Sequence, residues 1–378
     1  MTAIRSFLHG WRATTAGFGL AAILLFAVAP AALSEFRLNL LAKFLCFAIV
    51  AVGIGLAWGR GGMLTLGQGV FFGIGAYIMA MHLKLADAEL RGDEVPDFMQ
   101  ISGIRQLPGY WVPFSSPIVT ILAILTLPAL VALVLGYGVF KRRVKGAYFA
   151  ILSQALAAAL AILLIGQQSI GGFTGLSRFR TFFGFNLNDP ANRQMLFFIA
   201  AGTLLAVVAI ARQLMHSRYG ELLVAVRDQE ERVRFLGYDP ANVKIVAYVV
   251  AALFAGIAGA LFVPIVGIIS PADIGILPSI AFLIGVAIGG RTTLLGPVLG
   301  AIGVGWAQTT LSEEFPSGWT YFQGALFIIV VGFFPAGIAG LAKIRVQRRK
   351  RSATSPPAPE PLSAELEPEP EPEKEPAR

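Results

Sequence analysis

The sequence predicts an all-α polytopic membrane protein with about ten transmembrane helices. Of its 378 residues, 56% are hydrophobic and only 14% are charged, whereas a soluble domain carries about a quarter of its residues as charges. The charged residues also gather in clusters that long apolar stretches separate. A helix needs about 20 apolar residues to cross the hydrocarbon core of a bilayer. Runs of this kind occupy residues 16–33, 38–58, 65–84, 118–140, 146–165, 195–214, 243–263, 276–289, 296–312 and 322–341.

Three of these runs have a second interpretation. The runs at 276–289 and 296–312 are short and are flanked by glycine and proline, so they form either two spans or one broken element. The first run, 16–33, resembles a signal peptide that ends near Ala29–Ala32. Its length and the closely following second run favour a helix that is kept.

The distribution of charge among the loops predicts the orientation. Lysine and arginine are enriched in cytoplasmic loops. Basic residues fill Lys141–Lys145, the loop after the sixth run and the segment after residue 342, whereas the loop at 85–117 is acidic. With an even number of spans, all the basic loops share one side. We therefore expect a multi-pass protein of a bacterial inner membrane with both termini in the cytoplasm.

This topology divides the chain into three parts. Residues 1–15 form a cytoplasmic N-terminus. Residues 16–342 form the transmembrane domain, with a periplasmic loop at 85–117 and a cytoplasmic loop at 215–242. Residues 343–378 are first basic and then rich in proline and glutamate. Because such a tail buries little apolar surface, it is expected to be disordered.

Several classes of function are not expected from this sequence. The formal net charge is +8, but the basic residues lie at the ends of apolar runs, so no nucleic-acid partner is expected. The single cysteine, Cys46, forms no internal disulfide, and no cysteine–histidine cluster indicates a metal site. There is no Gly-x-x-x-x-Gly-Lys-Ser/Thr loop, so the chain is expected to bind no ATP or other cofactor itself.

The loop after the sixth run has the pattern of an amphipathic helix. Between Tyr219 and Lys244, apolar residues fall on one face and charged pairs stand four residues apart on the other. Gly237 is expected to end the helix, and Asp239-Pro240 to form a turn. Such a helix either enters a groove of a soluble partner or rests on the bilayer surface. The apolar residues are Leu222, Leu223, Val226, Val233 and Leu236, and the pairs are Asp228 with Arg232 and Glu230 with Arg234.

Three motifs follow one another along the chain. They are Gly61-Gly-Met-Leu-Thr-Leu-Gly-Gln-Gly-Val-Phe-Phe-Gly-Ile-Gly-Ala-Tyr77, Ala225-Val-Arg-Asp-Gln-Glu-Glu-Arg-Val-Arg-Phe-Leu-Gly-Tyr-Asp-Pro240 with Ala255-Gly-Ile-Ala-Gly-Ala-Leu261, and Gly289-Gly-Arg-Thr-Thr-Leu-Leu-Gly-Pro-Val-Leu-Gly-Ala301. In sequence and in order they resemble the motifs of the branched-chain amino-acid type ABC permeases. The resemblance covers roughly residues 38–342 and implies an ABC importer permease fold. The sequence differs from the family at Glu231–Arg234, where small residues are usual.

The resemblance implies a task for the amphipathic loop and partners for the chain. It identifies the loop as the coupling helix that docks on an ATPase subunit. It also implies a second, homologous permease, two cytoplasmic ATPase subunits that use the ATP, and a periplasmic solute-binding protein. The coupling residues that it indicates are Glu221, Ala225, Arg227, Asp228, Glu230 and Gly237.

Glycines and uncharged polar residues predict the translocation path. Glycines four residues apart, such as Gly69 and Gly73, let helix backbones approach closely. Gly61-Gly62 and Gly289-Gly290 mark helix breaks, which persist in a membrane only where protein or a water-filled path satisfies the backbone. Helix packing explains most of these glycines equally well. The residues that we predict to line a pore or a helix break are Gly67, Gln68, Gly69, Ser153, Gln154, Gly290, Gly296 and Pro297.

The substrate is less well determined than the class of protein. The segments 97–114 and 68–83 resemble the urea ABC transporter permease subunit, which favours urea; branched-chain amino acids are the alternative. A stand-alone channel or an ion-coupled carrier is the alternative of another class. No acidic residue lies deep within a predicted span, as ion-coupled transporters usually require. Lys43, near a helix start, is expected to extend towards the interface.

Overall fold

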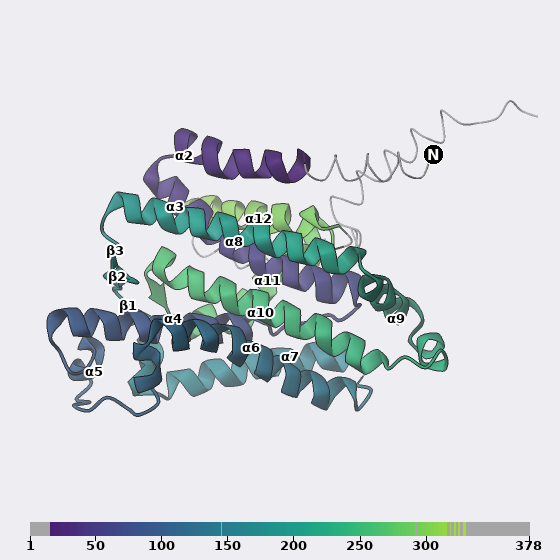
Figure 1. Ribbon diagram of the computed structural model, residues 1–378, viewed down its shortest axis with the longest axis horizontal. Helices are drawn as coiled ribbons and strands as arrows, with labels where there is room; N and C mark the ends of the chain where they lie inside the picture. Colours follow the sequence, from purple (N-terminus) through teal and green to yellow (C-terminus); the bar gives the residue numbers. More distant parts are fainter. Residues whose placement is uncertain are drawn as a thin grey trace, which may run out of the picture. The chain divides into compact units, whose positions relative to one another are not determined.

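The structure is a computed structural model that describes residues 16–144, 146–291, 293–315, 318, 321–322, 324–325 and 328–329. Within them the chain is mostly helical (Figure 1). Seven helices of the described residues are long and apolar enough to cross a membrane. They are α3 (Glu35–Ile54) with its π-helical continuation η2 (Gly55–Arg60), α4 (Gln68–Arg91), α6 (Pro117–Phe140), α7 (Gly146–Ile165), α8 (Pro190–His216), α10 (Pro240–Val266), and η6 (Pro271–Asp273) with α11 (Ile276–Gly289).

Shorter elements connect or flank these seven helices. An apolar helix at Ala16–Ala32 includes η1 (Leu24–Val28) and α2 (Ala29–Ala32). The other helices are α5 (Asp97–Ile101), η3 (Val112–Ser115), η4 (Gln168–Ile170), η5 (Gly172–Thr174), α9 (Arg218–Phe235) and α12 (Leu295–Glu314). Two antiparallel pairs of short strands are β1 (Leu176–Ser177) with β4 (Ile268–Ile269), and β2 (Thr181–Phe182) with β3 (Phe185–Asn186).

The predicted count of ten spans is not confirmed. The first predicted span corresponds to the shorter helix Ala16–Ala32, and the ninth to α12, which is not among the seven. Most of the tenth, 322–341, lies outside the described residues, as do the N-terminus at 1–15 and the tail at 343–378. The first helix packs on α8, where the rings of Phe26 and Phe198 stack with centroids 5.6 Å apart.

The region 276–312 forms two helices rather than one broken element. The chain reverses after Gly290, whose φ of 103° favours glycine, and α11 and α12 then run side by side in opposite directions. A Cβ atom on Gly285 would lie 2.9 Å from Cα of Ala301, and one on Gly289 would meet the backbone of Gly296. With 14 residues, α11 rises about 21 Å, which is less than the roughly 30 Å of a hydrocarbon core.

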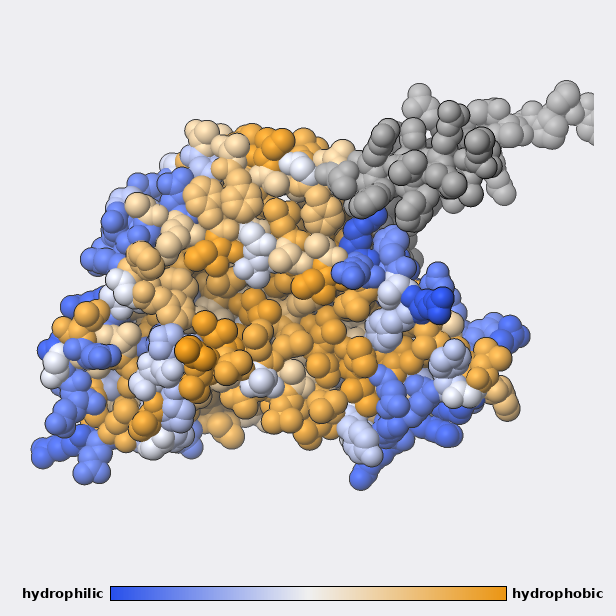
Figure 2. Space-filling model, in the orientation of Figure 1, coloured by the Kyte–Doolittle hydropathy of each residue, from blue (hydrophilic) through white to orange (hydrophobic). Residues whose placement is uncertain are grey.

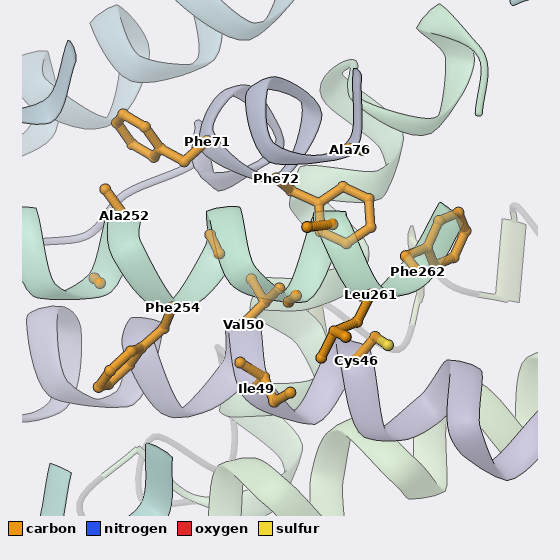
Figure 3. Packing of buried hydrophobic residues seen from close by; sticks show 14 of the residues in the cluster. Cys46, Ile49, Val50, Phe71, Phe72, Ala76, Ala252, Phe254, Leu261 and Phe262 are labelled. Carbon is orange, nitrogen blue, oxygen red and sulfur yellow. The ribbon is translucent and has the colours of Figure 1, made fainter. Parts of the chain in front are cut away.

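Helix α10 lies at the centre of the bundle, where it packs against α3, α4 and α6. Figure 3 shows Cys46 of α3 beside Leu261 of α10, with Phe72 of α4 above the same stretch of α10. In the most apolar stretch of α4, 83% of the residues are buried, whereas in that of α6 only 22% are buried. The outer helices therefore keep apolar side chains on the surface, and Figure 2 shows them as an orange area between two hydrophilic ends. Such a band matches the hydrocarbon layer of a bilayer.

Glycine brings the central helices into backbone contact. A Cβ atom on Gly75 of α4 would meet the carbonyl of Gly256 in α10, and one on Gly259 would meet the carbonyl of Phe72. Without Cβ atoms at these positions the two helices cross at van der Waals distance along their backbones. Close approach of this kind stabilises helix pairs in lipid, where apolar burial alone gives no preference for another helix over acyl chains.

The two ends of the bundle differ in their chemistry. We call the end that carries Arg60, Lys141, Arg227, Lys244 and Arg291 the basic end; α9 lies there (Figure 1). We call the opposite end, formed by the segments after α4 and after α7, the loop end. Helix α4 extends to Arg91, so the loop that was expected to begin at residue 85 begins at 92.

A buried carboxylate organises the loop end. Oδ1 of Asp87 accepts hydrogen bonds from the backbone N–H and the hydroxyl of Thr181, at 3.1 and 2.8 Å, and Oδ2 accepts one from the N–H of Arg180 at 2.9 Å. Lys84 and Asp97 form an ion pair of 3.0 Å. Burial raises the pKa of Asp97, but the hydrogen bond and the charge of Lys84 outweigh it and hold the pKa below its usual value. These bonds fasten the segment after α7 and α5 to the end of α4.

The crossing of α4 and α10 gives a first testable prediction. The substitution Gly75→Val places a side chain against the backbone of Gly256, and overpacking of this kind costs about 1–3 kcal/mol or more. We expect the thermal unfolding midpoint of the purified protein in detergent to fall by several degrees. Gly138→Val is the matched control, because a Cβ atom on Gly138 of α6 meets nothing within 4 Å. Equal midpoints for the two variants would contradict the close crossing.

Candidate translocation path and coupling segment

A stretch of non-helical chain precedes α4 inside the bundle. Residues 61–67 connect η2 at the basic end to the start of α4, and Gly61, Met63, Thr65 and Gly67 in this stretch are buried. The third predicted span begins at residue 65, but the helix begins only at Gln68. We call residues 61–67 the break. Buried non-helical backbone is tolerated at membrane depth only where other protein groups or water complete its hydrogen bonds.

Two serine hydroxyls from other helices complete part of the bonding at the break. The N–H of Leu66 donates to Oγ of Ser153 on α7 at 3.1 Å, and the N–H of Gly69 donates to Oγ of Ser279 on α11 at 3.1 Å. Each hydroxyl in turn donates to a carbonyl of its own helix at 2.9 Å, that of Ala150 or of Gly275. The serines thus accept from two N–H groups that have no earlier helical turn to bond to.

Two of the predicted path residues, Gly67 and Gly69, allow the break and the start of α4 to approach Ser153 and Ser279 closely. A Cβ atom on Gly67 would meet the carbonyl of Ser153, and one on Gly69 would lie 2.5 Å from Oγ of Ser279. Packing therefore explains both glycines, as it explains most glycines of the motif. Gln154, the neighbour of Ser153, is half-buried and belongs to none of these contacts.

Two polar side chains at the break remain without a partner among the described residues. Gln68 and Thr65 are each 1% exposed, yet neither amide atom of Gln68 nor the hydroxyl of Thr65 has a hydrogen bond. An unpaired buried polar group costs about 1–3 kcal/mol. Polar atoms at this cost commonly serve a ligand or water that the site admits. The side chains of Gln68 and Thr65 therefore keep buried donors and acceptors that a water molecule or a small polar ligand could satisfy.

The remaining predicted path residues lie elsewhere. Gly290 follows the end of α11 and Gly296 lies in the first turn of α12, where Oγ1 of Thr293 accepts from the N–H of Gly296 at 3.0 Å. Pro297 packs on Gly55, whose Cβ atom would lie 2.9 Å from the proline ring. Their contacts are with η2, with the end of α11 and with the turn itself, whereas Gly67 contacts α7 and Gly69 contacts Ile274 and the start of α11. The two groups of predicted path residues are therefore not brought together.

The amphipathic helix expected in the loop after the sixth run is α9. The hydroxyl of Ser217 accepts from the N–H of Gly220 at 3.3 Å at its start, and Gly237, with φ of 87°, follows its end. Leu223, Val226 and Val233 are buried as expected. Helix α9 packs against α8, α10 and η2.

A kink in α9 changes its predicted ion pairs. Gln229 has φ of −149° and ψ of 71°, which interrupts the helix. The pair Glu230–Arg234, at 3.2 Å, is confirmed. The predicted pair of Asp228 with Arg232 does not form, so that prediction is wrong, because the kink lies between the two residues. Asp228 instead accepts a hydrogen bond from Nε of Arg227 at 2.7 Å. That hydrogen bond holds the pKa of Asp228 below its usual value.

Arg227 joins α9 to the chain that leads into the break. Its Nη1 donates to the carbonyl of Gly59 at 2.7 Å. A Cβ atom on Gly62, which has φ of 70°, would lie 2.6 Å from Cγ of Arg227. The guanidinium of Arg291 lies 4.8 Å from the ring centre of Trp58, which belongs to η2 as Gly59 does. The π-helical turn η2 is therefore enclosed by groups from α9 and from the α11–α12 turn.

Two ion pairs hold the second half of α9 and the start of α10. Glu230 accepts from Nζ of Lys244 at 2.5 Å, and Asp239 accepts from Nζ of Lys141 at 2.5 Å. The hydrogen bond from Lys141 lowers the pKa of Asp239. Of the other predicted coupling residues, Glu221 and Ala225 are exposed, so their side chains are free to meet a partner.

Three large apolar side chains at the end of this segment are exposed, which the sequence pattern does not predict. Leu236 was expected on the buried face, but it is 73% exposed, next to Phe235 at 90% and Tyr238 at 55%. Val233, which also lies beyond the kink at Gln229, stays buried, so the exposure of large apolar side chains begins only at the last residue of α9. We call Phe235, Leu236 and Tyr238 the apolar tip. It lies at and just after the end of α9, which is at the basic end (Figure 1), whereas the apolar band lies between the two ends.

The comparisons with known proteins agree on one family. The family described as "Branched-chain amino acid transport system / permease component" matches residues 36–331. The permease protein LivM of the high-affinity branched-chain amino acid transport system of Escherichia coli K12 is 26% identical over 360 residues, which cover 88% of this chain and 77% of that protein. The permease protein LivH of the same organism is 24% identical over 310 residues, covering 79% and 92%. No solved structure matches the chain.

The hydrogen bonds at the break give a second prediction. Ser279→Ala removes the acceptor of the buried N–H of Gly69 and is expected to cost about 1–3 kcal/mol of unfolding free energy. Ser102→Ala is the control, because the Ser102 hydroxyl is exposed and surface substitutions change stability by only about 0.5 kcal/mol. Thermal unfolding in detergent compares the two variants. A loss for Ser279→Ala no larger than for Ser102→Ala would contradict the role given to this hydroxyl.

Proposed function

Because the chain belongs to the family of permease components of branched-chain amino acid transport systems, we propose that it forms part of the translocation path of an ATP-driven importer. The contact of α9 with the turn that leads into the break supports this proposal most strongly. A transport subunit driven by a separate motor needs a segment that receives force outside the membrane. It also needs a stretch inside the membrane that responds, and here Arg227 connects α9 to η2, which leads into the break.

The proposed mechanism follows the chain from α9 to Gln68. ATPase subunits move α9, and the bond between Arg227 and the carbonyl of Gly59 transmits the movement to η2. The break follows η2 without intervening helix, so displacement of η2 pulls on residues 61–67. The serine hydroxyls at Leu66 and Gly69 exchange partners more readily than helical hydrogen bonds, because a hydroxyl rotates. Gln68 and Thr65 then bond the passing solute in the open state.

The apolar tip is the proposed anchor on the ATPase. Large apolar side chains that enter a pocket of a partner supply most of the binding energy of an interface. In this proposal the basic end is cytoplasmic, as the positive-inside rule requires, and both termini lie on that side. The ATP is bound by the partner subunits, a second homologous permease completes the path, and a periplasmic binding protein delivers the solute to the loop end.

Branched-chain amino acids are the proposed solutes. The curated relatives are named as branched-chain amino acid permeases, and no comparison supports urea, which the segments 97–114 and 68–83 favoured. The relatives are about 25% identical to this chain, so the solute of this importer is inferred from the family and needs a direct test.

The apolar tip gives a prediction for coupling. The double substitution Phe235→Ala with Leu236→Ala is expected to lower ATPase co-purification and ATP-driven uptake by at least about tenfold, the effect of 1.4 kcal/mol. The loss arises because the anchor is removed while the buried face of α9 stays intact. Membrane insertion and unfolding midpoint are expected to remain unchanged.

The matched control is Ile162→Ala with Leu163→Ala on α7, where both side chains are exposed within the apolar band. This variant is expected to keep its ATPases. If the tip variant retained wild-type coupling, the apolar tip would instead rest on the bilayer surface, and the docking assignment would be wrong.

Uptake in a deletion strain tests the solute and the energy source together. Restoring this chain is expected to restore accumulation of labelled leucine at least tenfold, and depletion of ATP is expected to abolish it. Accumulation of labelled urea is expected to stay at the level of the deletion strain. Restored urea uptake would reverse the substrate assignment, and leucine uptake that follows the proton gradient rather than ATP would favour an ion-coupled carrier.

A further inference from the structure

A cavity of about 260 Å³ lies among α3, α4, α10, α11 and α12, apart from the break. Lys43 of α3, Asp273 at the end of η6 and Gln308 of α12 line it, together with phenylalanine side chains. Most small-molecule sites enclose roughly 300–1,000 Å³, so this cavity suits a solute smaller than a typical cofactor. The sequence placed Lys43 near the interface as an isolated charge, whereas the structure places it opposite an acid.

The two opposite charges in the cavity are not joined to each other. Lys43 and Asp273 are near enough for their charges to interact, but none of the ion pairs among the described residues joins them. The Nζ atom of Lys43 lies 5.8 Å from the ring centre of Phe47. Both hydrogen bonds that Asp273 accepts, from the N–H and the hydroxyl of Ser270 at 2.9 and 2.7 Å, go to Oδ2.

Charges at membrane depth are expensive and are usually paired or functional. A lysine and an aspartate that share a cavity would form a direct ion pair if structure alone were their task. Their separation leaves Nζ of Lys43 and Oδ1 of Asp273 available to a third group. A group that satisfies both must carry a negative and a positive charge on the same small molecule.

An aromatic wall completes the cavity. The rings of Phe47, Phe72, Phe262 and Phe282 form one cluster, in which the centroids of Phe72 and Phe262 are 5.2 Å apart and those of Phe47 and Phe282 are 5.3 Å apart. Figure 3 shows Phe72 and Phe262 side by side at the crossing of α4 and α10. Such a wall favours an aliphatic group, which gains roughly 25 cal/mol for each Å² of apolar surface that it buries.

We propose that this cavity is a binding site for a zwitterionic α-amino acid with an aliphatic side chain. Lys43 binds the α-carboxylate, Asp273 binds the α-ammonium, and the phenylalanine cluster contacts the side chain, while Gln308 offers a donor and an acceptor beside the charged groups. This inference rests on the proposed amino acid permease. It adds that the permease itself, and not only a binding protein, recognises the solute. Urea, which has neither charge nor an alkyl group, fits this cavity poorly.

Direct binding to the importer without its binding protein tests the site. The probe is labelled leucine, and binding is measured by scintillation proximity to the purified permease–ATPase complex in nanodiscs, both without nucleotide and with ATP bound. We expect saturable binding in at least one of these states. Leucinamide, which lacks the carboxylate, and 4-methylpentanoate, which lacks the ammonium, are each expected to compete at least tenfold more weakly than leucine.

Variants assign the two charges. Lys43→Met and Asp273→Asn are each expected to weaken leucine binding at least tenfold, and Lys43→Met is expected to remove the preference for leucine over leucinamide. Lys43→Arg keeps the charge and is expected to stay within threefold of the wild type, which separates loss of charge from loss of fold. Arg37→Gln is the control, because Arg37 lies on the same helix and lines a different cavity.

The outcomes separate this inference from the proposed function. Leucine binding that is unchanged in both Lys43→Met and Asp273→Asn would overturn the site. Absence of saturable leucine binding in an importer that transports leucine when its binding protein is present would overturn it as well. Equal loss in Lys43→Met and Lys43→Arg would refute the role of charge. If the complete importer failed to transport leucine, the permease assignment itself would be wrong.

Discussion

The requirement that every backbone polar group inside the bilayer finds a partner governs this structure. Continuous helices meet it by themselves, but the chain stops being helical between Arg60 and Gln68. There the hydroxyls of Ser153 and Ser279 replace the missing helical acceptors. Both serines must come within 3.1 Å of the backbone, so α7 and α11 are fixed around the start of α4. Glycine is needed at Gly67 and Gly69 because a Cβ atom there would collide with the backbone of Ser153 or of Ile274.

Two non-helical stretches among the described residues carry our two proposals. Residues 61–67 reach the basic end through η2, which contacts α9. The stretch from β4 to α11 is tied to β1 and carries Asp273 into the cavity that Lys43 shares. In our proposals the first stretch moves and the second recognises. Ser279 of α11 bonds to Gly69 of α4, so a solute held beside α11 and a force applied at α9 act on the same pair of helices.

Sequence patterns predict the local features well and the distant contacts poorly. The apolar runs locate the seven long helices, and the charge pattern of residues 219–237 predicts α9. The ion pair of Asp228 with Arg232 fails because no pattern marks the kink at Gln229. Ser279 is the one polar residue in the run at 276–289, and a lone hydroxyl in an apolar helix indicates a hydrogen-bond partner on another element. Lys43 and Asp273 lie far apart in the sequence. No local pattern connects residues so distant, because only the packing of the helices brings them into one cavity.

The single cysteine has a practical consequence for spectroscopy. Cys46 of α3 is fully buried where α3 packs against α10 (Figure 3). A thiol in apolar surroundings, away from water, reacts slowly with alkylating reagents. The natural chain is therefore close to a cysteine-free background for site-directed labelling. A fluorophore or spin label attached through a cysteine introduced at an exposed position, such as Tyr238, would report on that position alone. Distances between two such labels could then follow the chain through a transport cycle without removal of the native thiol.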